Sequence, residues 1–209
     1  DVSLPQRFEH QIEFLKQHPD VICAGTWTEV IDEAGRRIGV AKLPLTHAEI
    51  DQRQITGHTS ICHPTAMFRR EALSRLDTPG YKEPLNGAED LDLWLRMAEI
   101  GQLQNIPEPL VQYRHHEHSV TESKTEMLQA AARAACEQCW ERRNIQGVYL
   151  SDGPVRDTSN ARSRSKLAMS YGWNAFRHGH RSTARFYGWK AVYYAPWHRD
   201  AWKLLLCSY

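Results

Sequence analysis

The hydrophobic positions near the start of the chain change from helical to extended spacing. Phe8, Ile12 and Leu15 recur at the helical interval, and Pro19 predicts the end of that helix. Residues 20–31 are rich in Val, Ile, Thr and Trp, which predicts a strand. The chain therefore opens with a helix that leads directly into a long extended segment.

The pattern up to residue 113 predicts further short elements. In order, these are an extended segment at 37–43, a helix from Thr46 to Gln54, a strand at 66–68, helices at 69–76 and 89–100, and two short strands at 103–106 and 110–113 around Pro107. The helix at 89–100 is apolar over much of its circumference, so we expect it to be buried on several sides. This mixture predicts an α+β, helix-rich fold.

The character of the chain changes after His118. We divide it into a domain at 1–121, a long alanine-rich helix at 122–146, a polar linker at 147–165 and a helical appendage at 166–209. The spacing of small and aromatic residues in the appendage resembles one tetratricopeptide unit. Because one such unit cannot bury its own face, we expect it to pack on the preceding domain or on a partner.

The appendage is rich in aromatic side chains. These are Trp173, Phe176, Phe186, Trp189, Trp197 and Trp202. We interpret them as the core between helices. A role at a membrane edge is the alternative, since aromatic rings favour interfaces, although Arg and His interrupt the face.

The composition is that of a globular protein with neither a nucleic-acid-binding charge nor a transmembrane helix. Hydrophobic residues make up 41% and charged residues 24%, as in ordinary globular domains. The net charge of +1 provides no overall attraction to nucleic acid, and we predict no nucleic-acid partner. Five irregularly spaced cysteines suit a reducing cytoplasm, and Cys136 and Cys139 lack the second pair typical of a zinc site. No apolar run approaches the roughly 20 residues of a transmembrane helix.

Candidate chemistry is concentrated at residues 89–96, which read Glu-Asp-Leu-Asp-Leu-Trp-Leu-Arg. Carboxylates at a helix N-terminus are stabilised as anions by free backbone N–H groups, and such an anion can accept a proton from a hydroxyl. The alternative is that Asp90 only caps the helix. Asp92 and Arg96 are four residues apart, so we expect them to pair on the helix surface.

This segment resembles the Glu-Asp-x-Asp-Leu-Trp-x-Arg signature of family 2 glycosyltransferases, which are inverting enzymes with the GT-A fold. The resemblance implies that Asp90 is the general base for an acceptor hydroxyl. It implies that Glu89 orients the acceptor or the base, and that Tyr81 and Trp94 contribute to substrate binding.

Residues 105–116 are similar to the strand-ending segment in which Tyr-Arg-x-His closes the catalytic domain of this family. The resemblance implies that His116 is a metal ligand or lies near the diphosphate, and that Arg114 stabilises the leaving nucleoside diphosphate. Asp1 resembles the last aspartate of an Asp-x-Asp-Asp run that binds Mg²⁺ or Mn²⁺. The segment from His63 to Arg70 resembles one beneath the donor sugar, so His63 either contacts substrate or packs in its loop.

The family resemblance covers residues 1–121 and implies a nucleotide-sugar donor with a saccharide, lipid-linked or protein acceptor. It implies that a nucleotide-binding half precedes Asp1, so we expect the 209 residues alone to be inactive, and either to self-associate or to adopt a rearranged fold. Envelope polysaccharide is one expected product. The implied location is the cytoplasm, with the inner membrane face as a peripheral alternative.

Two other functions remain open at this stage. The first is a non-catalytic interaction module, in which the helical tail binds a protein partner and the carboxylates only cap a helix. The second is a metal protein built on His115, His116 and His118, because histidine is a common ligand of transition metals.

Overall fold

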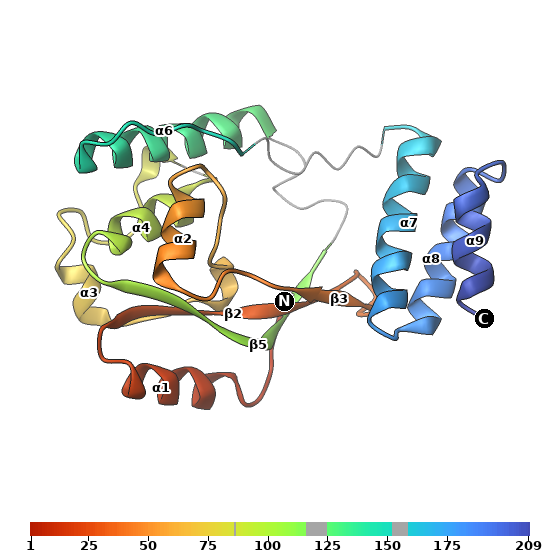
Figure 1. The fold of residues 1–209 in the computed structure, drawn as a ribbon, viewed down its shortest axis with the longest axis horizontal. Helices are drawn as coiled ribbons and strands as arrows, with labels where there is room; N and C mark the ends of the chain where they lie inside the picture. Colours follow the sequence, from red (N-terminus) through yellow and green to blue (C-terminus); the bar gives the residue numbers. More distant parts are fainter. Residues whose placement is uncertain (86, 116–124, 152–158) are drawn as a thin grey trace. The chain divides into compact units, whose positions relative to one another are not determined.

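The computed structural model describes residues 1–85, 87–115, 125–151 and 159–209. In this part of the chain, eight α-helices and a mixed five-stranded sheet form an α+β, helix-rich fold (Figure 1). The chain divides into two compact units. The first comprises residues 1–28, 42–111 and 118–153, and the second comprises residues 29–41, 112–117 and 154–209.

The elements of the first unit follow the predicted order closely. Its helices are α1 (Arg7–Gln17), α2 (His47–Gln54), α3 (Arg70–Ser74), α4 (Glu89–Ala98) and α6 (Thr125–Arg143), with short 3₁₀ turns η1 (His63–Thr65) and η2 (Glu83–Leu85). The α2 helix begins with the capping box of Thr46 and Glu49, in which each side chain bonds the other residue's backbone N–H. The predicted start of this helix at Thr46 is therefore confirmed.

The sheet is built from β1 (Val2–Ser3), β2 (Val21–Ile31), β3 (Arg37–Ala41), β4 (Met67–Phe68) and β5 (Gln102–Arg114). Its order is β1-β5-β2-β3, and β4 pairs antiparallel with β2. The long strands β2 and β5 run parallel, because backbone hydrogen bonds join their starts and their ends. The Gln102 N–H donates to the Asp20 carbonyl at 3.2 Å, and the His115 N–H donates to the Ile31 carbonyl at 2.8 Å.

The prediction of two short strands around Pro107 is wrong, because β5 is one continuous strand. Between the two hydrogen bonds that join it to β2, β5 contains more residues than β2 does. Pro107 and Pro109 lie within this irregular stretch. Proline has no N–H to donate, and an irregular stretch leaves strand positions at which that donor is not needed.

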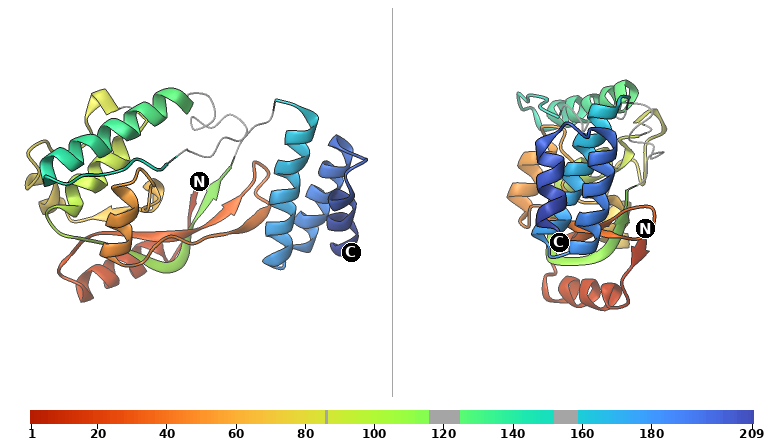
Figure 2. Two further views of the ribbon diagram at one scale, coloured as in Figure 1. Left: turned by 45° about the horizontal axis from the view of Figure 1, so that its top comes forward. Right: turned by 90° about the vertical axis from the view of Figure 1, so that its right-hand side faces the viewer.

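Helices cover both faces of β2 and β5 in the first unit (Figure 2). On one face, Leu15 of α1 packs in a cluster with Val21 and Ala24. On the other face, α2 and α4 contribute Ile50 and Met97 to a larger cluster, which is the main core of this unit. Phe8 and Ile12 of α1 are exposed, so the apolar stripe predicted for this helix is buried only in part.

The second unit contains three helices, α7 (Ala161–Arg177), α8 (Arg181–Tyr194) and α9 (Arg199–Cys207). The α7 helix begins inside the segment assigned to the linker, because the Asn160 side chain accepts the Ser163 N–H and caps it. Tyr187 of α8 is buried, and its hydroxyl donates to the Asp32 carboxylate at 2.9 Å. Val30 and Ile38 complete the apolar cluster beneath these helices.

The interpretation of the appendage aromatics as core is wrong for Phe186, Trp189, Trp197 and Trp202, which are all exposed. Small residues occupy the helix contacts in their place. A side chain on Gly188 would meet the Leu205 backbone at 3.0 Å, which shows how closely α8 and α9 approach. Close helix packing therefore turns the large rings outward.

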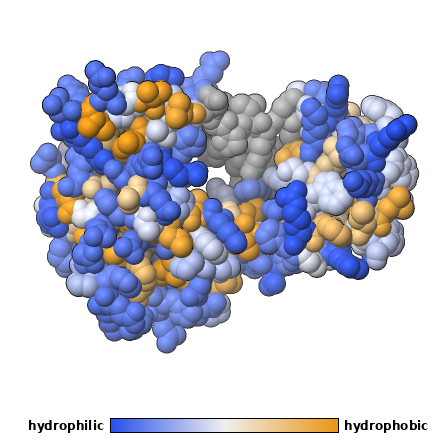
Figure 3. All heavy atoms as spheres, in the orientation of Figure 1, coloured by the Kyte–Doolittle hydropathy of each residue, from blue (hydrophilic) through white to orange (hydrophobic). Residues whose placement is uncertain are grey.

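The face shown in Figure 3 is mostly hydrophilic, with apolar side chains in separate groups. The longest of the described helices is α6, with 19 residues. None of these helices combines the length and hydrophobicity that crossing a bilayer requires.

Candidate active site

Asp90 lies in the first turn of α4. The helix follows Gly87, whose φ of +96° is a left-handed conformation that glycine adopts without strain, and the Gly87 N–H donates to the Glu89 carboxylate. The N-cap residue is Ala88, and no side chain caps it. Asp90 is the second helical residue, and its Oδ1 accepts the Leu91 N–H at 2.8 Å. Asp90 is therefore not the N-cap residue, but its carboxylate does bind one N–H group of the first turn.

The environment of Asp90 makes it a stronger base than an ordinary aspartate. Burial raises the pKa of its carboxyl group, and the nearby Glu89 carboxylate raises it further. The Leu91 N–H bond and the neighbouring His63 act in the opposite direction, but the net pKa remains raised. A carboxylate with a raised pKa binds a proton more tightly, as proton abstraction requires.

His63 is positioned by polar contacts within the first unit. The buried Gln11 amide donates from Nε2 to the carbonyls of Ala24 and Thr65, at 2.8 Å each. The Thr26 N–H donates to Thr65 Oγ1 at 3.1 Å. These bonds fix η1 against β2, so that the exposed His63 side chain starts from a rigid backbone.

Tyr81 meets His63 in front of α4. The Tyr81 hydroxyl and His63 Nε2 share a hydrogen bond of 2.7 Å, and the two rings meet edge to face. Partial burial and the charges of Asp90 and Glu89 raise the pKa of the Tyr81 hydroxyl. Tyr81 therefore remains a neutral donor beside two carboxylates.

The loop that carries Tyr81 is held by Arg96. The Arg96 guanidinium donates to the carbonyls of Thr78 and Gly80, at 2.6 and 2.7 Å. Its Nη2 also lies 2.7 Å from Asp92 Oδ2. The prediction that Asp92 and Arg96 pair is confirmed, but its surface placement is wrong because both side chains are buried. The ion pair therefore holds the loop of Tyr81 in place, and it is not a surface contact of α4.

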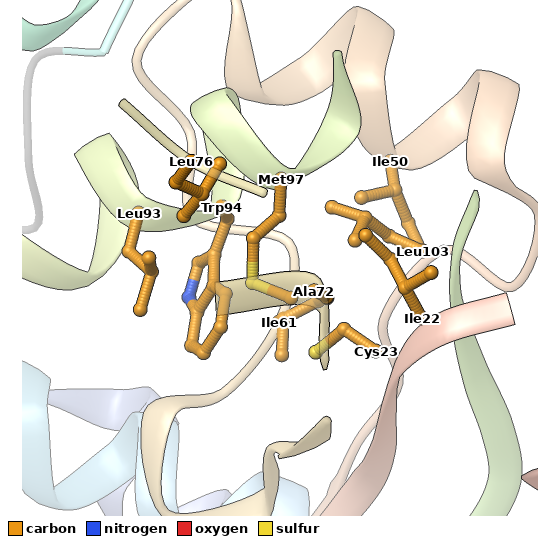
Figure 4. Close-up of a cluster of buried hydrophobic side chains, with 10 residues drawn as sticks. All are labelled: Ile22, Cys23, Ile50, Ile61, Ala72, Leu76, Leu93, Trp94, Met97 and Leu103. Carbon is orange, nitrogen blue, oxygen red and sulfur yellow. The ribbon is translucent and has the colours of Figure 1, made fainter. Parts of the chain in front are cut away.

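Trp94 lies behind this cluster. Its side chain is 0% exposed and packs with Leu93, Met97 and Ile61 in the main core (Figure 4). Its ring centroid lies 6.4 Å from that of His63. The structure thus places Trp94 in the core beneath His63, and its part in substrate binding stays a prediction.

The remaining candidates are Arg114, Asp1 and His116. Arg114 belongs to the second unit, where its Nη1 donates to the carbonyls of Asp32 and Glu33 at 2.9 and 2.8 Å. Asp1 is exposed at the start of the chain. His116 lies outside the described residues, as does His118 of the alternative histidine site. Within the described residues, no three His, Cys, Asp or Glu side chains are grouped to hold a metal ion.

Sequence patterns missed Cys62, which interacts with Asp90, and Arg7, which interacts with Cys62. Burial and the Asp90 charge raise the pKa of the Cys62 thiol to about 12, whereas the Arg7 guanidinium opposes this rise. Arg7 comes from α1, where its Nε donates to Gln11 at 2.9 Å. An isolated cysteine and a helix arginine carry no pattern of their own. Only the adjacency of Cys62 to His63 could have indicated its position.

No known protein-family profile matches the chain. Several curated proteins do. A protein named as the amylovoran biosynthesis glycosyltransferase AmsE of Erwinia amylovora is 32% identical over 117 residues, which are 54% of this chain and 41% of that protein. The chain is similar to glycosyltransferases.

Relatives with 26–36% identity over about half of the chain carry that description. EpsE of Bacillus subtilis, whose name assigns it provisionally to the glycosyltransferases, is 36% identical over 118 residues, or 54% of this chain and 40% of EpsE. A glycosyltransferase of Methanocaldococcus jannaschii, MJ1057, is named as uncharacterized and is 29% identical over 116 residues, or 54% of this chain and 39% of that protein. The chain thus spans about two fifths of the length of these relatives.

Proposed function

We propose that this chain is the acceptor-side part of an inverting glycosyltransferase that resembles the family 2 enzymes, with Asp90 as the general base. The observation that carries the proposal is the setting of Asp90. Its partly buried carboxylate has a raised pKa and lies next to the hydrogen-bonded pair of His63 and Tyr81. The similarity to proteins named as glycosyltransferases supplies the reaction class.

The proposed reaction transfers a sugar from a nucleotide-sugar to a hydroxyl acceptor. Asp90 removes the proton of the acceptor hydroxyl as its oxygen attacks the anomeric carbon. A new carbon–oxygen bond forms on one face while the bond to the diphosphate breaks on the other. The electron pair of the broken bond leaves with the nucleoside diphosphate, so the anomeric configuration inverts.

Neighbouring side chains prepare Asp90 for this step. Glu89 raises the pKa of Asp90 and accepts the Gly87 N–H, so it fixes the entry to α4 as well as the basicity of its neighbour. The exposed His63 and Tyr81 can contact the acceptor at this entry. Arg114 is proposed to stabilise the leaving diphosphate, since a guanidinium binds phosphate oxygens in pairs.

A divalent cation, Mg²⁺ or Mn²⁺, is part of the proposal for the whole enzyme, where it would neutralise the diphosphate. Asp1 supplies the hard oxygen that these ions prefer. A single carboxylate does not make a site, and the described residues contain no group of three His, Cys, Asp or Glu side chains that could hold a metal ion. Asp1 and His116 are its proposed ligands.

The product class remains a proposal as well. AmsE is named for amylovoran biosynthesis, and we propose by similarity that the enzyme builds an envelope polysaccharide on a saccharide or lipid-linked acceptor in the cytoplasm. Protein acceptors are the alternative. The exposed Phe8 and Ile12 support the further proposal that the isolated chain self-associates.

The test compares Asp90→Asn with the unchanged enzyme. Release of nucleoside diphosphate would be measured with UDP-glucose, UDP-galactose, UDP-N-acetylglucosamine and GDP-mannose as donors and alkyl glycosides as acceptors, with Mn²⁺ present. Loss of a general base is expected to lower the turnover number by about 10²–10⁴-fold. Donor binding, measured by titration with the nucleoside diphosphate and Mn²⁺, should remain nearly unchanged.

Glu71→Gln is the matched control. Glu71 is an exposed carboxylate in the first turn of α3, and its loss should leave turnover intact. Undiminished turnover in Asp90→Asn would disprove the assignment of the base. Retention of the anomeric configuration, observed in the product by NMR, would disprove inversion.

A further inference from the structure

The helices of the second unit carry a large excess of basic over acidic residues. In residues 159–209, nine Lys and Arg residues stand against the single acid Asp200, which gives a formal charge of +8. The chain as a whole has a net charge of +1, so the remainder is net negative. Such asymmetry indicates an anionic partner for this segment.

Aromatic rings form a stripe along the exposed face of α8. Phe186, Trp189 and Tyr193 are spaced by three and four residues, so they lie on one face of the helix. Trp189 is 52% exposed and Tyr193 is 82% exposed. Helical geometry places Arg181 on one side of this stripe and Lys190 on the other. Amphipathic rings are thus flanked by cations on a single helix.

The exposed surface continues beyond α8. Trp197, in the turn to α9, is 74% exposed, and Leu206 of α9 is 72% exposed. Arg185 joins α8 to the last residue of the chain, because its guanidinium lies 4.0 Å from the centre of the Tyr209 ring. Exposed apolar and aromatic side chains therefore occur on α8, on α9 and in the turn between them, and Arg185 lies among them.

A cavity of about 510 Å³ lies at the N-terminus of α8. It is lined by Arg36, Arg37, His180, Arg181, Ser182 and Thr183. No side chain caps this helix, and its first turn contains no acidic residue. Arg36 also lies 3.6 Å from the centre of the Phe186 ring, so the basic cavity adjoins the aromatic stripe. A phosphate group matches the guanidinium groups that line this cavity.

We propose that the exposed face of α8, together with Trp197 and Leu206, docks on an anionic phospholipid surface. Tryptophan and tyrosine favour the headgroup region, where their rings are buried and their polar atoms stay hydrated, while lysine and arginine are attracted to anionic lipid. A second copy of the chain fits less well, since two faces of this charge repel each other. The proposal concerns attachment to a membrane and does not rest on the proposed transfer activity.

The test is co-sedimentation of the 209-residue chain with phospholipid vesicles. Vesicles of phosphatidylcholine with phosphatidylglycerol would be compared with vesicles of phosphatidylcholine alone, at low and high salt. We expect binding to the anionic vesicles that weakens with salt. Each cation lost from the surface is expected to lower the partition coefficient about fivefold, since each contributes about 1 kcal/mol.

Two variants and two matched controls separate the contributions. Arg181→Glu/Lys190→Glu removes the flanking cations, and Lys16→Glu/Arg70→Glu makes the same charge change on the first unit. Trp189→Ser/Tyr193→Ser removes the aromatic stripe, and Phe8→Ser/Ile12→Ser removes exposed apolar side chains from α1. Both α8 variants should lose binding and both controls should keep it. Far-UV circular dichroism checks that each variant is folded.

Three results would overturn the proposal. The first is no binding of the unchanged chain to anionic vesicles. The second is binding that persists in both α8 variants or is lost equally in the controls. The third is retention on single-stranded RNA, but not on vesicles, with the same losses in the α8 variants, which would assign the face to nucleic acid.

Discussion

His63 and Tyr81 share a hydrogen bond of 2.7 Å although 18 residues separate them in the chain. Gln11 and Thr65 fix the backbone on the histidine side, and Arg96 fixes the tyrosine loop. The bond therefore joins two independently anchored segments in front of the Asp90 carboxylate. Its strength can be measured without knowing the substrate.

A double-mutant cycle of His63→Ala and Tyr81→Phe should show coupling of about 0.5–1.5 kcal/mol, the usual net value of one hydrogen bond. Each single change is expected to lower the free energy of unfolding slightly, because both side chains are exposed. Urea denaturation followed by tryptophan fluorescence gives the four values. Strictly additive losses would show that the bond does not form in solution.

The raised pKa of Asp90 predicts how activity depends on pH. Because burial favours the protonated carboxyl, the acidic limb of the rate profile should lie above the ordinary aspartate range near 3.9. Activity should fall as the pH drops through that raised value. The measurement is initial rate against pH, with Glu71→Gln as a control whose profile should match that of the unchanged enzyme.

The same pKa has a consequence for stability. A carboxyl whose pKa is raised by folding favours the folded state when protonated, so its contribution is lost as the pH rises through the folded pKa. Asp90→Asn lacks this loss, and its melting temperature relative to the unchanged protein should increase from acidic to neutral pH. A difference that stays constant over this range would contradict the raised pKa.

Removal of Arg96 should strongly destabilise the first unit. Arg96→Met leaves the buried Asp92 carboxylate with only Lys82, 3.7 Å away, and is expected to cost about 3–5 kcal/mol. The double variant Asp92→Leu/Arg96→Met removes the orphaned charge and should recover part of that loss. A single variant within 1 kcal/mol of the unchanged protein would show that the pair contributes little.

Gly25 marks a tight contact between β2 and Asn105. A Cβ atom at this position would lie 2.1 Å from Asn105 Oδ1, and the Asn105 amide already bonds the carbonyls of Pro44 and Ser60. Gly25→Ala should therefore cost about 1–3 kcal/mol of unfolding free energy. Gly80→Asn is the control, since that left-handed position has open space around it and asparagine tolerates the conformation.

Most helices and strands of the first unit could be predicted, because the signals that define them lie within a few adjacent residues. The Thr46–Glu49 capping box and the apolar circumference of α4 are properties of a few adjacent residues. Joining the segments of β5 into one strand required its pairing with β2, which no local pattern contains. The outward turn of Trp189 likewise depends on how closely α8 and α9 approach at Gly188.

In the candidate site, too, the sequence predicted some features, and others depend on tertiary packing. The sequence singled out Asp90, Glu89, His63 and Tyr81, and the structure brings His63 and Tyr81 into direct contact. It could not show that Trp94 is buried beneath them or that Arg96 holds the tyrosine loop, because both facts depend on tertiary packing. The functional roles of all these residues, and of Asp1, Arg114 and His116, stay predictions.

The buried Gln11 amide gives α1 an influence over His63. Its Nε2 bridges the Ala24 and Thr65 carbonyls, so a displacement of α1 must either carry η1 with it or break two hydrogen bonds. Because breaking these bonds costs free energy, α1 and η1 are expected to move together. A molecule that binds to the exposed Phe8 and Ile12 of α1 would therefore also change the position of the His63 imidazole.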